Sequence, residues 1–191
     1  TEDWANRKGF TVSGGAGANF PSTAQVTALG RQGGVSSFPV TGVDNANYLR
    51  GQRTLENNRG GVLRNRTSVL GDIVGSSPAY VADTDTLYVG ANDGMLHAFD
   101  AATGQELFAY VPGIIDISAL STLSRPDYTH RYFVDGPVSV TSRTLTPGKN
   151  LLIGTLGRGG KGGFALDVSA PQTATAASVY KWELRDTATG T

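Results

Sequence analysis

The chain has 191 residues, of which 39% are hydrophobic, 17% are charged and 26 are glycines. This composition favours many short strands joined by tight turns, so we expect an all-β fold. The 16 basic and 16 acidic side chains cancel, which leaves no long-range field to attract nucleic acid or an anionic membrane. No apolar run approaches the roughly 20 residues that span a bilayer, and no signal-type segment opens the sequence. We therefore expect neither a nucleic-acid partner nor a membrane span.

The sequence contains no cysteine, which excludes a disulfide framework and a Cys-ligated zinc site but leaves the cellular compartment open. It starts with threonine and not with methionine, and it ends on Thr-Ala-Thr-Gly-Thr. We interpret it as a fragment of a longer protein.

Residues 1–58 are expected to form a loop-rich N-terminal flanking segment. The first 41 residues are rich in Gly, Ser and Thr and show no sustained period of two or of 3.6, so they predict loops with one or two short strands. A short helix is predicted near residues 44–50, because Asp44 or Asn45 suits an N-cap and Gly51 suits a helix stop.

Residues 59–191 predict part of a β-propeller. After a basic, glycine-rich stretch, short strands alternate with turn sequences such as Asn-Asp-Gly at residues 92–94, which is typical of a hairpin. Four strands in a meander make one propeller blade, and we place the first blade at about residues 68–112. Its strands are predicted at residues 78–82, 86–91, 95–100 and 105–112.

The same strand pattern returns in degraded form at about residues 131–186, which predicts a second blade. The matching segments are residues 132–140, 150–156, 163–168 and 179–184, the last of which aligns with residues 106–111. Residues 113–130 form a loop insertion between the blades, with room for a short helix at 117–123. Because propellers typically have 4–8 blades, either the remaining blades lie outside this sequence or the piece holds together on a subset of its contacts.

Clustered acidic and amide residues are candidates for calcium binding, namely Asp83, Asp85, Asn92 and Asp93. They lack the Asp-x-Asp-x-Asp-Gly spacing and the distal Glu of a calcium loop. Asp and Asn are also common in turns. We therefore assign no metal ligand.

The glycine-rich run at residues 157–163 resembles a phosphate-binding loop only in composition. It lacks the GxxxxGK[ST] spacing, and a strand is predicted after it where a helix is required. A glycine-rich hairpin between strands is the better interpretation, with Arg158 and Lys161 as candidate partner contacts.

No catalytic constellation is found. His97 lies mid-strand and His130 lies in a loop, and neither has a serine in a nucleophile-elbow context or a cysteine beside it. Core packing or surface hydrogen bonding is expected for both. Arg64 and Arg66 are expected to form ion pairs with Asp72 or another turn carboxylate. We predict no catalytic, cofactor-binding or metal residue and therefore no enzyme.

Five motifs occur in order along the chain. They are Leu-Arg-Gly at 49–51, Arg-Asn-Arg-Thr-Ser-Val-Leu-Gly-Asp-Ile-Val-Gly-Ser-Ser-Pro at 64–78, Tyr-Val-Gly-Ala-Asn-Asp-Gly-Met-Leu-His-Ala-Phe-Asp at 88–100, His-Arg-Tyr-Phe-Val-Asp-Gly-Pro at 130–137 and Leu-Gly-Arg-Gly-Gly-Lys-Gly at 156–162. Together they resemble the C-terminal domain of the PilC/PilY family of type IV pilus proteins, over about residues 42–185.

The resemblance implies a modified quinoprotein-like β-propeller that is exported and displayed at the cell surface, at the pilus tip or on the outer membrane. It implies a non-catalytic role in pilus extension, adhesion and twitching motility, with pilins or minor pilins, an unidentified host or abiotic surface ligand, and the remaining blades of the parent chain as partners. Some members bind calcium through an EF-hand-like loop, which this sequence lacks, so calcium is expected only in the missing part of the parent protein. The Arg-Gly-Asp of some members is also absent, because Gln52 follows Arg50 and Gly51.

Two alternatives stay open. The blade repeat alone also fits a fragment of a pyrroloquinoline-quinone-dependent dehydrogenase, although no calcium centre, cationic ring contact or stacking tryptophan can be placed for that cofactor. A generic outer-membrane scaffold propeller, which binds neither pilins nor host surfaces, fits the repeat as well.

Overall fold

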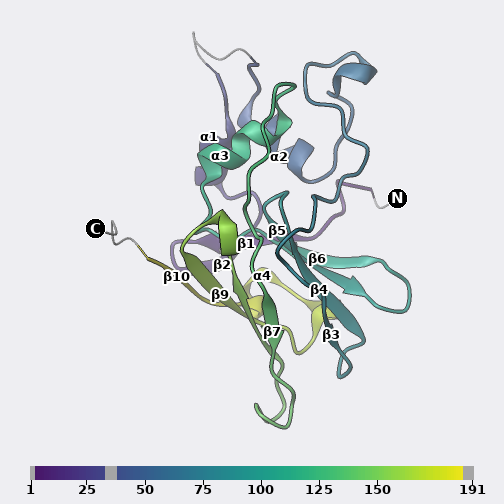
Figure 1. Cartoon of the computed structure of the whole chain (residues 1–191), viewed down its shortest axis with the longest axis vertical. Helices are drawn as coiled ribbons and strands as arrows, with labels where there is room; N and C mark the ends of the chain where they lie inside the picture. Colours follow the sequence, from purple (N-terminus) through teal and green to yellow (C-terminus); the bar gives the residue numbers. More distant parts are fainter. Residues whose placement is uncertain (1–2, 33–37, 187–191) are drawn as a thin grey trace.

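The computed structural model of the chain describes residues 3–32 and 38–186, and most of their regular structure is β-strand in two sheets (Figure 1). The strand orders are β2-β1-β6-β5-β4-β3 and β10-β9-β8-β7. The first sheet contains β1 (Gly9–Ser13), β2 (Ala16–Asn19), β3 (Ala79–Val81), β4 (Thr86–Ala91), β5 (Met95–Asp100) and β6 (Glu106–Tyr110). The second contains β7 (Val138–Val140), β8 (Leu151–Thr155), β9 (Gly162–Asp167) and β10 (Tyr180–Arg185). The described strands do not close into a barrel.

Strands β3 to β6 form an antiparallel meander, which we call the first meander. β4 and β5 confirm the strands predicted at residues 86–91 and 95–100. Asn-Asp-Gly forms the hairpin turn that the sequence predicts between them. Gly94 takes a φ of 91°, and the Asp93 carboxylate accepts a hydrogen bond from the Met95 amide at 3.2 Å. Glycine adopts such a positive φ without steric cost.

Strands β7 to β10 form the second meander, also antiparallel. Its last three strands confirm the predictions, but the strand predicted at residues 132–140 is wrong over its first half, since β7 begins at Val138. The preceding residues form no strand: the Asp135 amide donates to the Leu156 carbonyl just after β8, and the other bonds run to segments earlier in the chain. The Phe133 amide donates to Asn92 Oδ1 at 3.0 Å, and Asp135 Oδ1 accepts from the Gly75 amide at 2.8 Å.

The N-terminal segment extends the first sheet. β1 pairs in parallel with β6 and antiparallel with β2, so one sheet continues across the division placed at residue 58. Helix α1 (Thr23–Leu29) did not stand out in the sequence, although it begins with a capping box formed by Ser22 and Gln25. In such a box each side chain satisfies a backbone amide that the first helical turn leaves free.

Helix α2 (Gly42–Leu49) confirms the short helix predicted near residues 44–50, with a different N-cap. Thr41, and not Asp44 or Asn45, caps the helix by accepting from the Asp44 amide. The buried Asn45 side chain instead donates to the carbonyls of Leu29 at 2.8 Å and Ser121 at 2.9 Å. It therefore ties three helices together.

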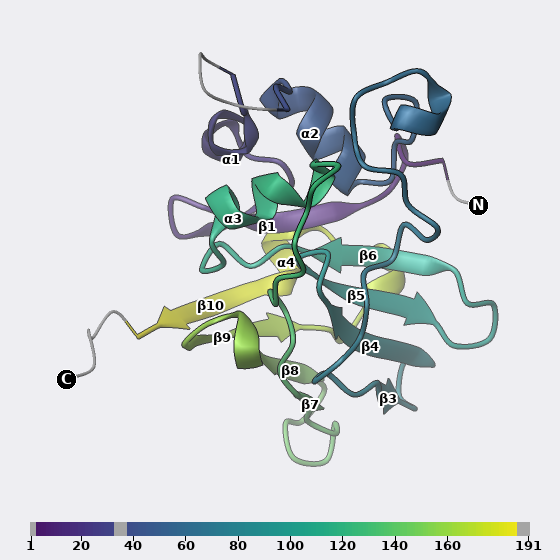
Figure 2. The ribbon, with the colours of Figure 1, turned by 45° about the horizontal axis from the view of Figure 1, so that its top comes forward.

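The loop insertion between the meanders contains the predicted helix, as α3 (Ile117–Ser121) followed by the 3-10 turn η2 (Thr122–Ser124). Figure 2 shows α1, α2 and α3 gathered as one layer over β1. The remaining short elements are η1 (Asn57–Arg59), η3 (Gly157–Gly159), η4 (Pro171–Thr173) and α4 (Ala176–Val179).

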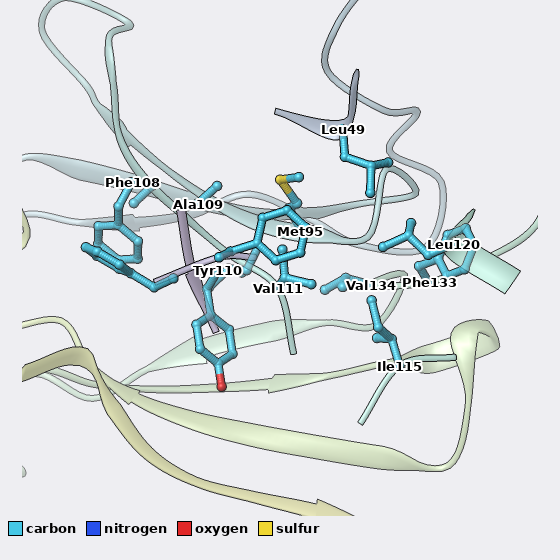
Figure 3. Close-up of a cluster of buried hydrophobic side chains, with 14 of the residues drawn as sticks. Leu49, Met95, Phe108, Ala109, Tyr110, Val111, Ile115, Leu120, Phe133 and Val134 are labelled. Atoms are coloured by element: carbon cyan, nitrogen blue, oxygen red, sulfur yellow. The ribbon is translucent and has the colours of Figure 1, made fainter. Parts of the chain in front are cut away.

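The core runs from the helical layer through the first sheet to the second sheet, and Figure 3 shows part of it around β6. The aromatic side chains of β6 form its centre. Phe108 packs on Tyr88 with ring centroids 6.4 Å apart, and Tyr110 packs on Phe164 of β9 at 5.6 Å. Because Phe108 and Tyr110 are both 0% exposed, this face of the first meander is fully covered.

Candidate functional site

Three of the sequence motifs meet at the end of the first meander where β4 turns into β5. Asn92, in that turn, donates through Nδ2 to Asp72 Oδ2 at 3.1 Å and to Asp135 Oδ1 at 3.4 Å. Its Oδ1 accepts from the Phe133 amide at 3.0 Å. We call this group of Asp72, Asn92, Phe133 and Asp135 the motif junction. One buried amide side chain thus holds segments that are distant in the sequence.

The glycines of the 64–78 motif are part of the same arrangement. The Gly71 amide donates to Asp93 Oδ2 at 3.0 Å and the Gly75 amide donates to Asp135 Oδ1 at 2.8 Å. A Cβ at Gly71 would lie 2.3 Å from the Asp93 nitrogen, and one at Gly75 would lie 2.6 Å from the Asp135 carbonyl oxygen. These positions require glycine because the backbones approach too closely for a side chain.

A buried ionic cluster lies next to the motif junction. His97 of β5 is 0% exposed, and its ring nitrogens lie 3.1 Å from Asp93 Oδ1 and 2.6 Å from Glu106 Oε1. Arg7 reaches Glu106 through two guanidinium nitrogens, with Nη2 at 2.8 Å from Oε1. We call Arg7, Asp93, His97 and Glu106 the ionic cluster.

The ionic cluster keeps His97 charged. Burial opposes the charged imidazolium, but the two carboxylates outweigh burial and raise the pKa of His97 to about 9. Burial would likewise raise the pKa of Asp93 and Glu106, but the bonds from His97 and Arg7 prevail and lower both pKa values. With both nitrogens engaged and no exposed surface, His97 has no lone pair to offer a substrate. It acts as a buried cation that joins β5 to β6 and, through Arg7, to the N-terminal segment.

The arginines of the 64–78 motif have other partners than Asp72. Arg66 Nε lies 2.9 Å from Glu56 Oε1, and the guanidinium carbon of Arg66 lies 3.6 Å from the centroid of the Tyr48 ring. Arg66 therefore pairs with a carboxylate other than Asp72, which was the second of the two expected pairings. Arg64 donates to the Leu123 carbonyl. The expected pairing with Asp72 is therefore wrong, because both guanidinium groups turn toward the helical layer.

The carboxylate of Asp72 pairs with a histidine. His130 Nε2 lies 2.8 Å from Asp72 Oδ2, and the His130 ring packs edge-on against Tyr132 with centroids 4.8 Å apart. This confirms surface hydrogen bonding for His130, as core packing is confirmed for His97. The sequence did not predict that both histidines pair with carboxylates.

Arg158 and Lys161 lie exposed on the connection between β8 and β9, which confirms the glycine-rich hairpin. Arg158 donates to the Tyr132 hydroxyl at 3.1 Å. Lys161, with a side chain 68% exposed, lies 4.0 Å from Asp186. Tyr132 is the neighbour of Phe133 in the motif junction, but neither Arg158 nor Lys161 has a bond to the junction itself, and their role as partner contacts stays a prediction.

The four candidate calcium ligands do not converge. Asp83 accepts from Asn150 Nδ2 at 2.7 Å and Asp85 accepts from the Tyr80 hydroxyl at 2.9 Å. Asn92 is buried in the motif junction and Asp93 is buried in the ionic cluster. Within residues 3–32 and 38–186, no group of three or more His, Cys, Asp or Glu side chains could hold a metal ion. The expectation that this chain contributes no calcium ligand stays a prediction.

The model of the PilY1 beta-propeller domain matches residues 70–189 of the chain. The chain belongs to this family. A type IV pilus biogenesis factor PilY1 homolog of Xylella fastidiosa is 40% identical over 167 residues, which cover 72% of this chain and 14% of the relative. The type IV pilus biogenesis factor PilY1 of Pseudomonas aeruginosa strain UCBPP-PA14 is 37% identical over 161 residues, which cover 68% of this chain and 13% of the relative. No solved structure matches the chain.

All four residues of the motif junction lie within the matched range. Arg7, which completes the ionic cluster, lies before that range. The chain spans only about 14% of the length of the curated PilY1 relatives. Among the helices of the described residues, none has the length and apolar character to cross a membrane.

Proposed function

We propose that the chain is a non-catalytic part of a type IV pilus tip and assembly protein that supports pilus extension, surface adhesion and twitching motility. The observation that carries the proposal is family membership, with relatives at 37% and 40% identity that are named type IV pilus biogenesis factors. The order of the motifs along the chain agrees with it.

The geometry supports a role in binding and assembly over catalysis. The polar side chains of the motifs bond one another and the backbone, and His97 has both nitrogens engaged. These contacts hold loops in place, and loops on a rigid sheet scaffold are the usual carriers of binding function.

Partners and location follow from this role. The parent protein would be exported to the cell surface, at the pilus tip or the outer membrane, and would contact pilins or minor pilins. The two meanders would be consecutive blades of a quinoprotein-like propeller, completed by further blades of the parent chain. Any calcium that the parent binds would then lie in those other blades.

A quinone-dependent dehydrogenase is not favoured, because the family match and the named relatives all point to pilus biogenesis. The second candidate is a scaffold propeller without pilin contacts, which the repeated strand pattern alone would also fit. Crosslinking of the parent protein to pilins distinguishes it from the pilus role.

The proposal is tested by shearing surface pili from cells and probing them for the full parent protein by immunoblot. The comparison strain lacks the major pilin. Recovery of the protein only when pilin is present is expected. Equal recovery from both strains, or none from either, would contradict the proposal.

A further inference from the structure

A small cavity opens beside the ionic cluster, between the N-terminal segment and the first sheet. Its volume is about 220 Å³, and its mainly apolar wall includes Trp4, Arg50, Val69, Leu70, Phe99 and Glu106. Sites for small molecules and cofactors typically measure about 300–1,000 Å³. The cavity is therefore sized for one or two amino-acid side chains.

Arg50 supplies an unpaired cation to this cavity. Its Nη2 donates to the Ala5 carbonyl at 3.0 Å, and its guanidinium carbon lies 5.7 Å from the centroid of the Trp4 ring. Its Nε is buried and has no hydrogen-bond partner. Within the described part of the chain, Arg50 forms no ion pair with an acidic side chain. The guanidinium charge of Arg50 therefore has no carboxylate beside it among the described residues, and an acidic group at the cavity would supply one.

The other charged groups of the wall are already engaged. Arg7 and Glu106 pair with each other, and Glu106 also bonds His97. Burial lowers the pKa of Arg50, and the positive charge of Arg7 adds to this effect. An excess of positive charge therefore remains at Arg50, and it would be relieved by a carboxylate.

The apolar part of the cavity wall determines which kind of side chain fits next to that carboxylate. Leu70 is 36% exposed, and the Phe99 ring stacks on His97 with centroids 5.7 Å apart. Gly51 also lines the cavity, and an added Cβ there would crowd Val69 at 3.1 Å and lie 3.5 Å from Trp4. An apolar side chain beside a carboxylate would remove the surface of Leu70 and Phe99 from water, which favours binding.

We propose that this cavity, the Trp4–Arg50 pocket, binds an acidic side chain of a partner protein whose neighbouring apolar side chain lies on Leu70 and Phe99. The carboxylate pairs with the Arg50 guanidinium on the cavity side of the Trp4 ring. The proposal goes beyond the pilus role and does not depend on it, because it concerns a peptide chemistry that can be measured on the chain alone.

The probes are the acetylated, amidated tripeptide Leu-Glu-Phe and its Leu-Gln-Phe counterpart. The chain has two tryptophans, so a Trp182→Phe background leaves Trp4 as the fluorescent reporter at the pocket. Titration is expected to show the glutamate peptide binding at least tenfold more tightly than the glutamine peptide. Arg50→Gln is expected to remove this preference.

Arg59→Gln is the matched control, because Arg59 is exposed on η1 away from the pocket. It should leave the tenfold preference unchanged. Circular dichroism checks that each variant folds, and Leu70→Glu is a second variant that keeps Arg50 in place. It puts a carboxylate on the pocket wall and should weaken the glutamate peptide at least tenfold.

Equal binding of the two peptides would overturn the proposal, and so would an unchanged preference in Arg50→Gln or an unchanged affinity for the glutamate peptide in Leu70→Glu. Free isovalerate binding as tightly as the glutamate peptide would also overturn it, because the pocket would then suit a free small acid. Loss of the parent protein from sheared pili would leave these titrations untouched, so the two proposals can fail separately.

Discussion

The two meanders pair their strands alike, yet one face is covered in the first and open in the second. Ala98 pairs with Phe108 in the first sheet as Ala165 pairs with Trp182 in the second. Phe108 is 0% exposed because the second sheet covers its face, whereas Trp182 is 42% exposed. Tyr110 and Leu184 also occupy equivalent positions, and they are 0% and 67% exposed.

This contrast bears on the propeller proposed above. Leu184 is 67% exposed and Ile153 is 38% exposed on the open face of the second meander, and apolar side chains gathered on one exposed face can mark a contact surface. If each meander packs onto the next one as the first packs onto the second, a further blade covers Trp182. Under the proposed propeller, the open face is where the next blade would pack.

The largest expected difference in stability is between variants of Phe108 and Trp182, the equivalent aromatic residues of the two meanders. Phe108→Ala removes a fully buried ring and should lower the free energy of unfolding by about 3–5 kcal/mol. Trp182→Ala should lower it by no more than about 1 kcal/mol, because the ring is largely in water. Urea denaturation of the chain followed by circular dichroism measures both. Equal losses would mean that the two faces are equally buried.

A second difference is the ionic cluster, which only the first meander has among the described residues. His97 stays protonated in the folded state up to about pH 9, whereas the unfolded chain releases this proton near pH 6.5. The contribution of the charged His97 to the free energy of unfolding is complete below about pH 6.5 and is lost as the pH rises to about 9. The free energy of unfolding should fall over this range by at most about 1.4 kcal/mol per pH unit.

The His97→Gln variant provides the control for this pH dependence. It should be less stable than the wild-type chain below pH 6.5 and should lack the fall between pH 6.5 and 9. Denaturation midpoints measured across this range compare the two chains. Parallel profiles would show that His97 is not the titrating group.

The smallest effect on stability is expected at Leu184. Leu184→Glu should change the free energy of unfolding by no more than about 0.5 kcal/mol, since the side chain is exposed. It should nevertheless reduce self-association of the chain, because it breaks an apolar face beside the free edge of β10. Sedimentation analysis measures this, with exposed Leu145→Glu on a distant loop as the matched control. Equal effects of both variants would argue against a special role of the open face.

Strand positions could be predicted from the sequence because alternation and turn residues are local signals. Asn-Asp-Gly at residues 92–94 located β4 and β5. The alignment of the last repeat was wrong by one residue, however: it matched Trp182 with Ala109, whereas the ladders match Trp182 with Phe108. Register irregularities next to Ala98 and before Trp182 cause this shift, and such bulges leave no clear mark in a single sequence.

The contacts of the site were harder to predict. The ionic cluster joins Arg7 to Glu106, which are 99 residues apart, and no sequence spacing indicates that pair. Helix α1 was missed because its capping box stands in a segment rich in Gly, Ser and Thr. The glycines at positions 71 and 75 were the available signal for the motif junction, because glycine recurs where backbones approach closely.

The proposal that the two meanders are consecutive blades implies a further blade that covers Trp182. Hydroxyl-radical footprinting of Trp182 tests this directly when the chain is compared with the full parent protein, and Leu145 serves as an internal reference. The account predicts that Trp182 oxidation falls several-fold in the parent while Leu145 oxidation is unchanged. Equal oxidation of Trp182 in both would contradict the claim.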